Sequence, residues 1–175
     1  MLNKKSILNF VYAIALVGAI ISCIGILSEF LNIAQLYRVQ VYNENTMSSE
    51  LPYYTYSFLF YIVAFLISAS AVALMILNLL KEGILSKKAV NIGICAACAV
   101  LFIMSFVIFY VLRYKPGEGF YYTHITASIA SMNYVTYYSF RTCIMSFVAN
   151  AGIVVACNIL NEKCKKNDAE SGEDA

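Results

Sequence analysis

The chain has 175 residues, of which 61% are hydrophobic and only 13% are charged. Its length suits one compact domain of ordinary size, and its composition excludes a typical water-soluble domain, in which about a quarter of the residues carry charge. The formal net charge of +2 and the lack of any basic stripe in the sequence exclude nucleic acid as a partner.

Four long stretches of the sequence are almost free of charge. Each holds about 20 residues or more, which as a helix cross a hydrocarbon core of roughly 30 Å. A bilayer interior offers no water to the backbone, so spanning segments of this kind must be helical. We therefore expect an all-α transmembrane domain over residues 1–160, with spans at residues 7–31, 54–80, 89–112 and 138–160.

The first span holds a candidate site residue, Glu29, near its outer end. Glu29 shares one helix face with Gly18, Ser22 and Gly25, since the steps between them alternate between four and three residues. We expect the carboxylate to pair with Arg141 and so to join the outer ends of the first and fourth spans. In a transporter the same carboxylate would instead exchange protons or bind substrate.

The stretch Ile20-Ile21-Ser22-Cys23 in the same span is similar to a bacterial lipobox. Cleavage there would make Cys23 a lipidated amino terminus. The apolar run continues beyond Cys23, however, and is longer than the roughly 7–15 residues of a signal peptide. This length favours an uncleaved span, with the lipoprotein as the open alternative.

The second and third spans are joined by a short segment, residues 81–88, which makes them antiparallel neighbours. Cys95 and Cys98 have the spacing of a redox motif. Because they lie inside a span, where a thiol is inert, we interpret them as packing residues. The only histidine, His124, lies outside the spans. We therefore expect no catalytic residue, no metal and no cofactor.

The last part of the chain combines a surface helix, a span and a tail. Residues 123–134 alternate apolar and polar positions at helical spacing, which predicts a short helix on the outer membrane surface. The fourth span begins near Arg141 and contains Asn150, which we interpret as an interhelical hydrogen-bonding residue. Residues 161–175 are expected to be a disordered cytoplasmic tail, in which lipidation of Cys164 stays open.

Orientation follows from the basic residues. Eight of the twelve lie before the first span, between the second and third, or after the fourth. Positive charge resists translocation, so both ends of the chain are predicted to be cytoplasmic. Every tyrosine except Tyr12 lies at or near the opposite side, where amphipathic rings favour the membrane–water boundary. Claudins, tetraspanins and connexins are four-span proteins whose outer loops carry diagnostic cysteines, and claudins add a tryptophan motif. Here the predicted outer loops hold no cysteine and the chain has no tryptophan.

Small and polar residues recur along each span at alternating steps of four and three, which favours close helix contact and left-handed packing. The predicted fold is a left-handed four-helix bundle with both ends inside. The stripes are Ala15, Gly18, Ser22, Gly25 and Glu29; Ser57, Tyr61, Ala64, Ser68, Ala71 and Asn78; Asn91, Cys95, Cys98 and Ser105; and Thr142, Ser146, Ala149 and Ala156.

These observations favour a non-enzymatic membrane protein. Charge is absent from the middle of the spans, whereas proton- or ion-coupled carriers need deep ionisable groups. We expect a scaffold or accessory subunit of a membrane assembly, in the plasma membrane. The alternative is a small oligomeric transporter or channel with Glu29, Arg141 and Asn150 around its path. The expected partners are the lipid bilayer and either another membrane protein or further copies of this chain.

Overall fold

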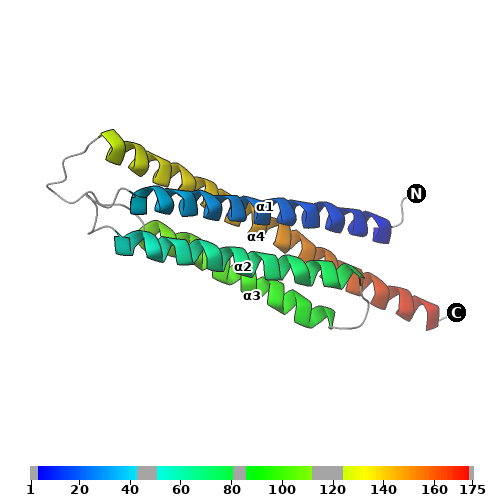
Figure 1. Ribbon diagram of the computed structural model, residues 1–175. Coiled ribbons are helices and arrows are strands. Elements are labelled where there is room, and N and C mark those ends of the chain that lie inside the picture. The colour runs from blue at the N-terminus through cyan, green and yellow to red at the C-terminus, as the bar shows by residue number, and fades with distance from the viewer. Residues whose placement is uncertain (1–3, 43–50, 81–85, 112–123, 174–175) are drawn as a thin grey trace.

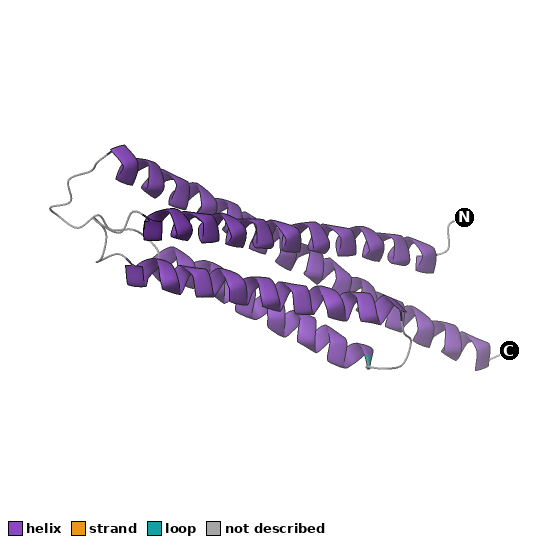
Figure 2. Ribbon diagram, in the orientation of Figure 1, coloured by secondary structure: helices purple, strands orange, loops and turns teal. Residues whose placement is uncertain are grey.

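The computed structural model describes residues 4–42, 51–80, 86–111 and 124–173, and side-chain environments for residues 6–32, 59–79, 86–107 and 138–164. It contains four helices in these ranges, and the described parts hold no strand (Figure 2). The helices are α1 (Lys4–Tyr42), α2 (Leu51–Leu80), α3 (Lys87–Val111) and α4 (His124–Glu173).

The helices run side by side along one long axis, and α1 begins at the same end of the bundle at which α4 ends (Figure 1). Helix α1 packs against α2 and α4, and α3 packs against the same two helices. The contact between α1 and α4 is the most extensive of these. The four helices therefore form a closed ring of neighbours around one core.

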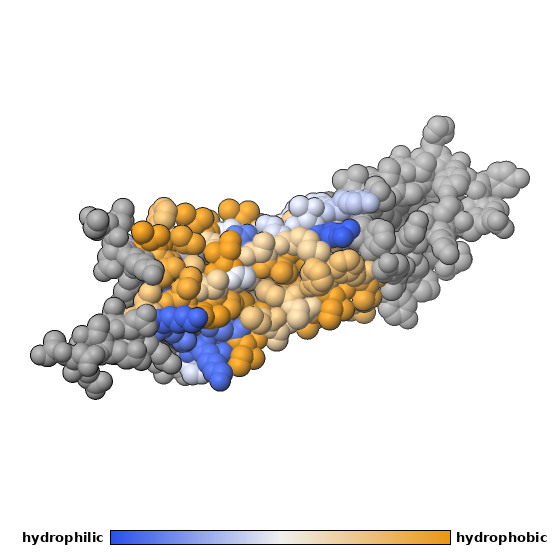
Figure 3. Space-filling model, turned by 180° about the vertical axis from the view of Figure 1, so that it is seen from behind, coloured by the Kyte–Doolittle hydropathy of each residue, from blue (hydrophilic) through white to orange (hydrophobic). Residues whose placement is uncertain are grey.

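Each helix contains a segment long and apolar enough to cross a membrane, which confirms the predicted number and type of spans. These segments are Ser6–Asn32, Leu59–Leu79, Lys87–Val107 and Tyr138–Cys164. Large apolar side chains such as Phe10, Ile21 and Ile103 are exposed on the outside of the bundle. Figure 3 shows apolar colour over most of the visible face between the grey ends. An apolar surface of this extent is unfavourable in water, whereas it is favourable in contact with the hydrocarbon of lipids.

Two helix starts follow from local chemistry. Helix α2 begins at Leu51 and has Pro52 in its first turn, where proline costs nothing because that N–H has no partner in the helix. At the start of α3, the Ala89 backbone N–H donates to the hydroxyl of Ser86 at 3.3 Å. Ser86 is thus the amino-terminal cap of α3.

Helix α4 is longer than the sequence patterns predict. From His124 on, the expected surface helix (residues 123–134) and the expected span (residues 138–160) belong to one continuous helix. This helix runs on through residues 161–173, where a disordered tail is predicted. No glycine or proline interrupts the sequence between His124 and Ala151, so no residue type forces a break there. In the last part, Glu162 precedes Lys166 by four residues, a spacing that favours helix.

The predicted packing stripes agree with burial in the first two spans and fail in the fourth. Ala15 and Ser22 on α1 and Ala64, Ser68 and Ala71 on α2 are buried. The fourth-span stripe is not buried, although its Ser146 contacts Ser22 of α1, and Cys95 on α3 is exposed as well. The exposed fourth-span residues are Thr142, Ser146, Ala149 and Ala156.

The core face of α4 consists instead of large side chains, including Phe140, Ile144 and Phe147, all fully buried. The facing helices present alanines and serines, and a close-packed interior needs large side chains opposite small ones. The Phe140 ring lies 4.1 Å from the Tyr61 ring of α2, centroid to centroid. Volume complementarity therefore selects which face of α4 is buried.

Candidate functional site

Four contacts between residues of α1 and α4 follow one another along their interface. On each helix the residues are four, three and four positions apart, and the two sets run in opposite directions. We call this set the α1–α4 ladder. Its rungs are Gly18 with Asn150, Ser22 with Ser146, Gly25 with Cys143, and Glu29 with Ser139.

Two rungs require glycine because the opposite side chain occupies the space of a Cβ atom. A Cβ built on Gly18 would lie 2.5 Å from Asn150 Oδ1, and one built on Gly25 would lie 2.6 Å from Cys143 Sγ. Real Cβ atoms do not approach other heavy atoms this closely. The two glycines thus let the backbone of α1 approach α4, as small residues do in other membrane helix pairs.

The Ser22 and Ser146 rung is a hydrogen bond inside the span. The two hydroxyl oxygens lie 2.9 Å apart, and Ser22 Oγ also lies 2.8 Å from the Gly18 carbonyl oxygen. One turn further along α4, the Asn150 amide donates to the Ser146 carbonyl at 2.8 Å. This bond holds the predicted polar residue Asn150 against Gly18, so its amide is engaged in helix packing.

The outermost rung corrects the prediction that Glu29 pairs with Arg141. The Glu29 carboxylate accepts a hydrogen bond from the Ser139 hydroxyl, and Asn32 donates to its other oxygen at 3.4 Å. The Arg141 guanidinium lies 5.4 Å from the centroid of the Phe106 ring of α3, a cation–π contact. Glu29 and Arg141, both in the described part of the chain, form no ion pair.

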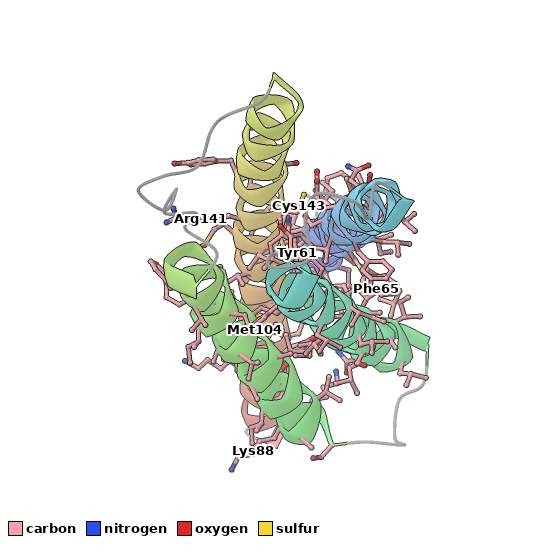
Figure 4. All side chains as sticks on the ribbon, turned by 60° about the vertical axis from the view of Figure 1, so that its left-hand side comes forward. Tyr61, Phe65, Lys88, Met104, Arg141 and Cys143 are labelled. Atoms are coloured by element: carbon pink, nitrogen blue, oxygen red, sulfur yellow. The ribbon has the colours of Figure 1, made fainter. Side chains whose placement is uncertain are left out.

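The reason is helical phase. Ser139 and Arg141 are two residues apart on α4, and two residues turn an α-helix by about 200°. If Ser139 faces α1, then Arg141 must face away from it. Figure 4 shows the same geometry for Cys143 and Arg141, whose side chains leave α4 on opposite sides. A similar level along the bundle therefore does not place the two side chains next to each other.

A second polar cluster lies near the end of the bundle at which α1 begins and α4 ends, and each of the four helices contributes one side chain. We call it the amide network. The Asn78 amide donates to Asn158 Oδ1 at 3.0 Å, and the Asn158 amide donates to Asn91 Oδ1 at 2.8 Å. Tyr12 donates to the Met75 carbonyl at 2.8 Å, and the Asn78 amide lies 3.5 Å from the Tyr12 oxygen.

Asn158 is the centre of this network. Its side chain is only 4% exposed, as is that of Tyr12. A buried amide needs partners for both its oxygen and its nitrogen. Asn78 on α2 and Asn91 on α3 supply these partners, and so they hold Asn158 at the α2–α3 pair. The three asparagine amides do not titrate, so they can orient and recognise polar groups but cannot act as acids or bases.

A third amide contact lies one turn beyond Asn158. The Asn161 amide on α4 is 3.4 Å from Asn9 Oδ1 on α1. The Asn161 Oδ1 atom is buried, and no described residue donates to it. At this end of the bundle, the oxygen and the nitrogen of the Asn158 amide both have partners, whereas the Asn161 oxygen has none among the described residues.

The sequence patterns pointed to part of the amide network only. Asn78 and Asn91 stand in the predicted stripes, whereas Asn158 does not. The signal that could have found it is compositional. Tyr12 is the one tyrosine away from the side predicted to face outward, and asparagine occurs in every span near the same end of the bundle.

The cysteines form no cluster suited to chemistry in the described part of the chain. Cys98 is half-buried and Cys95 is exposed, while Cys23 is buried with its sulfur 3.4 Å from the Ser68 hydroxyl. No group of three or more histidine, cysteine, aspartate or glutamate side chains among the described residues is placed to hold a metal ion. Comparison with protein-family models, curated proteins and solved structures finds no match for this chain.

Proposed function

We propose that this chain is a non-enzymatic integral membrane protein that acts as a scaffold or accessory subunit of a membrane assembly. The observation that carries the proposal is the use of the interior polar groups. In the α1–α4 ladder and the amide network they bond to one another between helices. Polar groups used for helix association are not available to conduct ions or to bind a substrate.

The proposed bundle is left-handed, with both chain ends in the cytoplasm and the plasma membrane as its location. Support for the handedness comes from the ladder, because contacts at alternating steps of four and three are those of left-handed packing near +20°. Support for the orientation comes from the eight basic residues that follow or precede spans on one side.

Thiol labelling on intact cells tests the orientation. A cysteine introduced at Glu44 or at Glu118 should react with a membrane-impermeant maleimide, and one at Lys88 should react only after the cells are opened. Lys88 is an exposed residue in the first turn of α3, so its silence would not come from burial. Labelling at Lys88 together with silence at Glu44 and Glu118 would invert the topology.

Isolation at native abundance in a mild detergent tests the function. A scaffold or accessory subunit should migrate on size exclusion with a different membrane protein at a fixed stoichiometry, and the complex should survive re-purification through that partner. Recovery of this chain as a monomer or as a homo-oligomer alone would contradict the proposal.

The alternative, a small oligomeric transporter or channel, draws its support from Glu29. Its carboxylate oxygens are bound to the Ser139 hydroxyl and the Asn32 amide, so no described basic side chain occupies the place of a transported cation. Proteoliposomes containing the purified chain decide between the two functions. Ion flux that is abolished by Glu29→Gln, with thermal stability unchanged, would favour transport and remove the scaffold proposal.

A further inference from the structure

The two halves of the bundle are closed by different chemistry. In the half away from the chain ends, α2 meets α4 through the tilted rings of Tyr61 and Phe140, both fully buried. In the half near the chain ends, α2 meets α4 through the hydrogen bond between Asn78 and Asn158. Aromatic burial is lost when water enters, whereas a hydrogen bond between amides can be replaced by hydrogen bonds to water.

The amide network lies near the end of α2 and the start of α3. Asn78 is two residues from the end of α2, and Asn91 is four residues after the start of α3. At 1.5 Å per residue, these positions are about 3–6 Å along the axis from the ends of their helices. The nearby Asn161 Oδ1 is buried without a described donor, so hydration of this region would satisfy a polar atom that the closed bundle leaves unpaired.

We propose that the amide network is a latch: it holds the α2–α3 pair against α1 and α4, and its release opens this end of the bundle while the rest stays closed. Asn158 is the central latch residue because it bonds to both Asn78 and Asn91. Opening separates α4 from the α2–α3 pair at this end only, since the Tyr61 and Phe140 contact is at the other end. The proposal stands independently of the scaffold function, because it concerns a motion of the isolated bundle.

The chain carries its own reporter for this motion. Cys157 is adjacent to Asn158 in sequence and is 3% exposed, so a maleimide reaches it only if the latch end opens. Cys23 is 8% exposed and bonds to Ser68, deep in the first and second spans. Labelling of Cys157 without Cys23 therefore reports local opening, and labelling of both reports unfolding of the whole bundle.

The test measures N-ethylmaleimide labelling of the full-length protein in lipid nanodiscs, with each cysteine quantified by peptide mass spectrometry. In Asn158→Leu, which removes both hydrogen bonds and keeps the side-chain volume similar, Cys157 should label at least tenfold faster than in the wild type, and Cys23 should stay slower than Cys157 in both proteins. Asn91→Leu removes one of the two bonds and should give a smaller acceleration at Cys157. Asn32→Leu, the same substitution at an exposed amide at the opposite end, should change neither rate.

Each other outcome overturns the latch. Equal labelling rates of Cys157 and Cys23 in Asn158→Leu mean that the two ends open together and that the amides stabilise the whole bundle rather than one end. Unchanged labelling of Cys157 in a folded Asn158→Leu protein means that packing alone keeps this end closed. If Asn158→Leu does not fold, the comparison of Asn91→Leu with Asn32→Leu decides by the same two rates.

Discussion

The α1–α4 ladder and the amide network are both polar, yet they stabilise the bundle in different ways. The ladder joins two helices along much of their length and depends on missing side-chain atoms, because glycine lets the backbones approach. The network joins all four helices at one level and depends on amide groups that are present and paired. The ladder therefore determines how close α1 and α4 lie, and the network determines which helices meet at its level of the bundle.

The largest effect should come from filling a glycine of the ladder. Gly18→Leu places a side chain where Asn150 already lies, and overpacking of this kind costs about 1–3 kcal/mol. Adding Asn150→Ala should recover part of this loss by vacating the space. Unfolding in mixed detergent micelles measures both. Gly152 is the matched control, because no atom lies within 4 Å of its added Cβ. A loss in Gly152→Leu as large as in Gly18→Leu would mean that the ladder has no special role.

The next effect tests the network as a hydrogen-bonded unit. Asn158→Leu leaves Asn78 and Asn91 without their shared partner and should cost about 1–2 kcal/mol of unfolding free energy. A double-mutant cycle with Asn91→Leu should give a coupling of about 0.6 kcal/mol, the average for hydrogen bonds between membrane helices. Strictly additive losses would show that the two amides do not act together.

These two regions also show what the sequence could predict. The number of spans could be predicted from the lengths of the charge-free stretches. The steps of four and three residues identified the α1 side of the ladder, from Gly18 to Glu29, because glycine and serine in an apolar helix commonly mark a helix contact. The same pattern failed on α4, whose buried face is set by the size of Phe140 and Phe147 against alanines on other helices. The network escaped prediction because it needs three-dimensional proximity between Asn158 and two asparagines that precede it by 67 and 80 positions.

A smaller effect distinguishes the observed contacts of Glu29 and Arg141 from the predicted ion pair between them. Because Ser139 can donate to an amide oxygen as it does to the Glu29 carboxylate, Glu29→Gln should cost less than about 1 kcal/mol. Arg141→Gln should lose the cation–π contact with Phe106, about 0.5–1 kcal/mol. Thermal unfolding of the single mutants and of the charge-swapped pair measures this. The swap should restore nothing, and a swapped protein more stable than either single mutant would re-establish an ion pair.

The smallest effect concerns the middle rung. Ser146→Ala removes the hydroxyl 2.9 Å from Ser22, but Ser22 keeps its contact with the Gly18 carbonyl. The expected loss is about 0.6 kcal/mol, measured by the same unfolding assay. Ser70→Ala is the control, since Ser70 is exposed and its hydroxyl donates to the Leu66 carbonyl of its own helix. A loss above that of Asn158→Leu would reverse the order of the two regions.

The continuity of α4 has a mechanical consequence. Its 50 residues extend over about 75 Å at 1.5 Å per residue, whereas a bilayer with its headgroups is about 40–45 Å thick. The helix therefore projects well beyond the membrane as a rod. Phe140 and Phe147 fix the rotation of α4 about its axis in the core, and they therefore also set the angular position of every residue in its last turns. If the span rotated about its axis, a protein bound near Glu173 would be rotated with it.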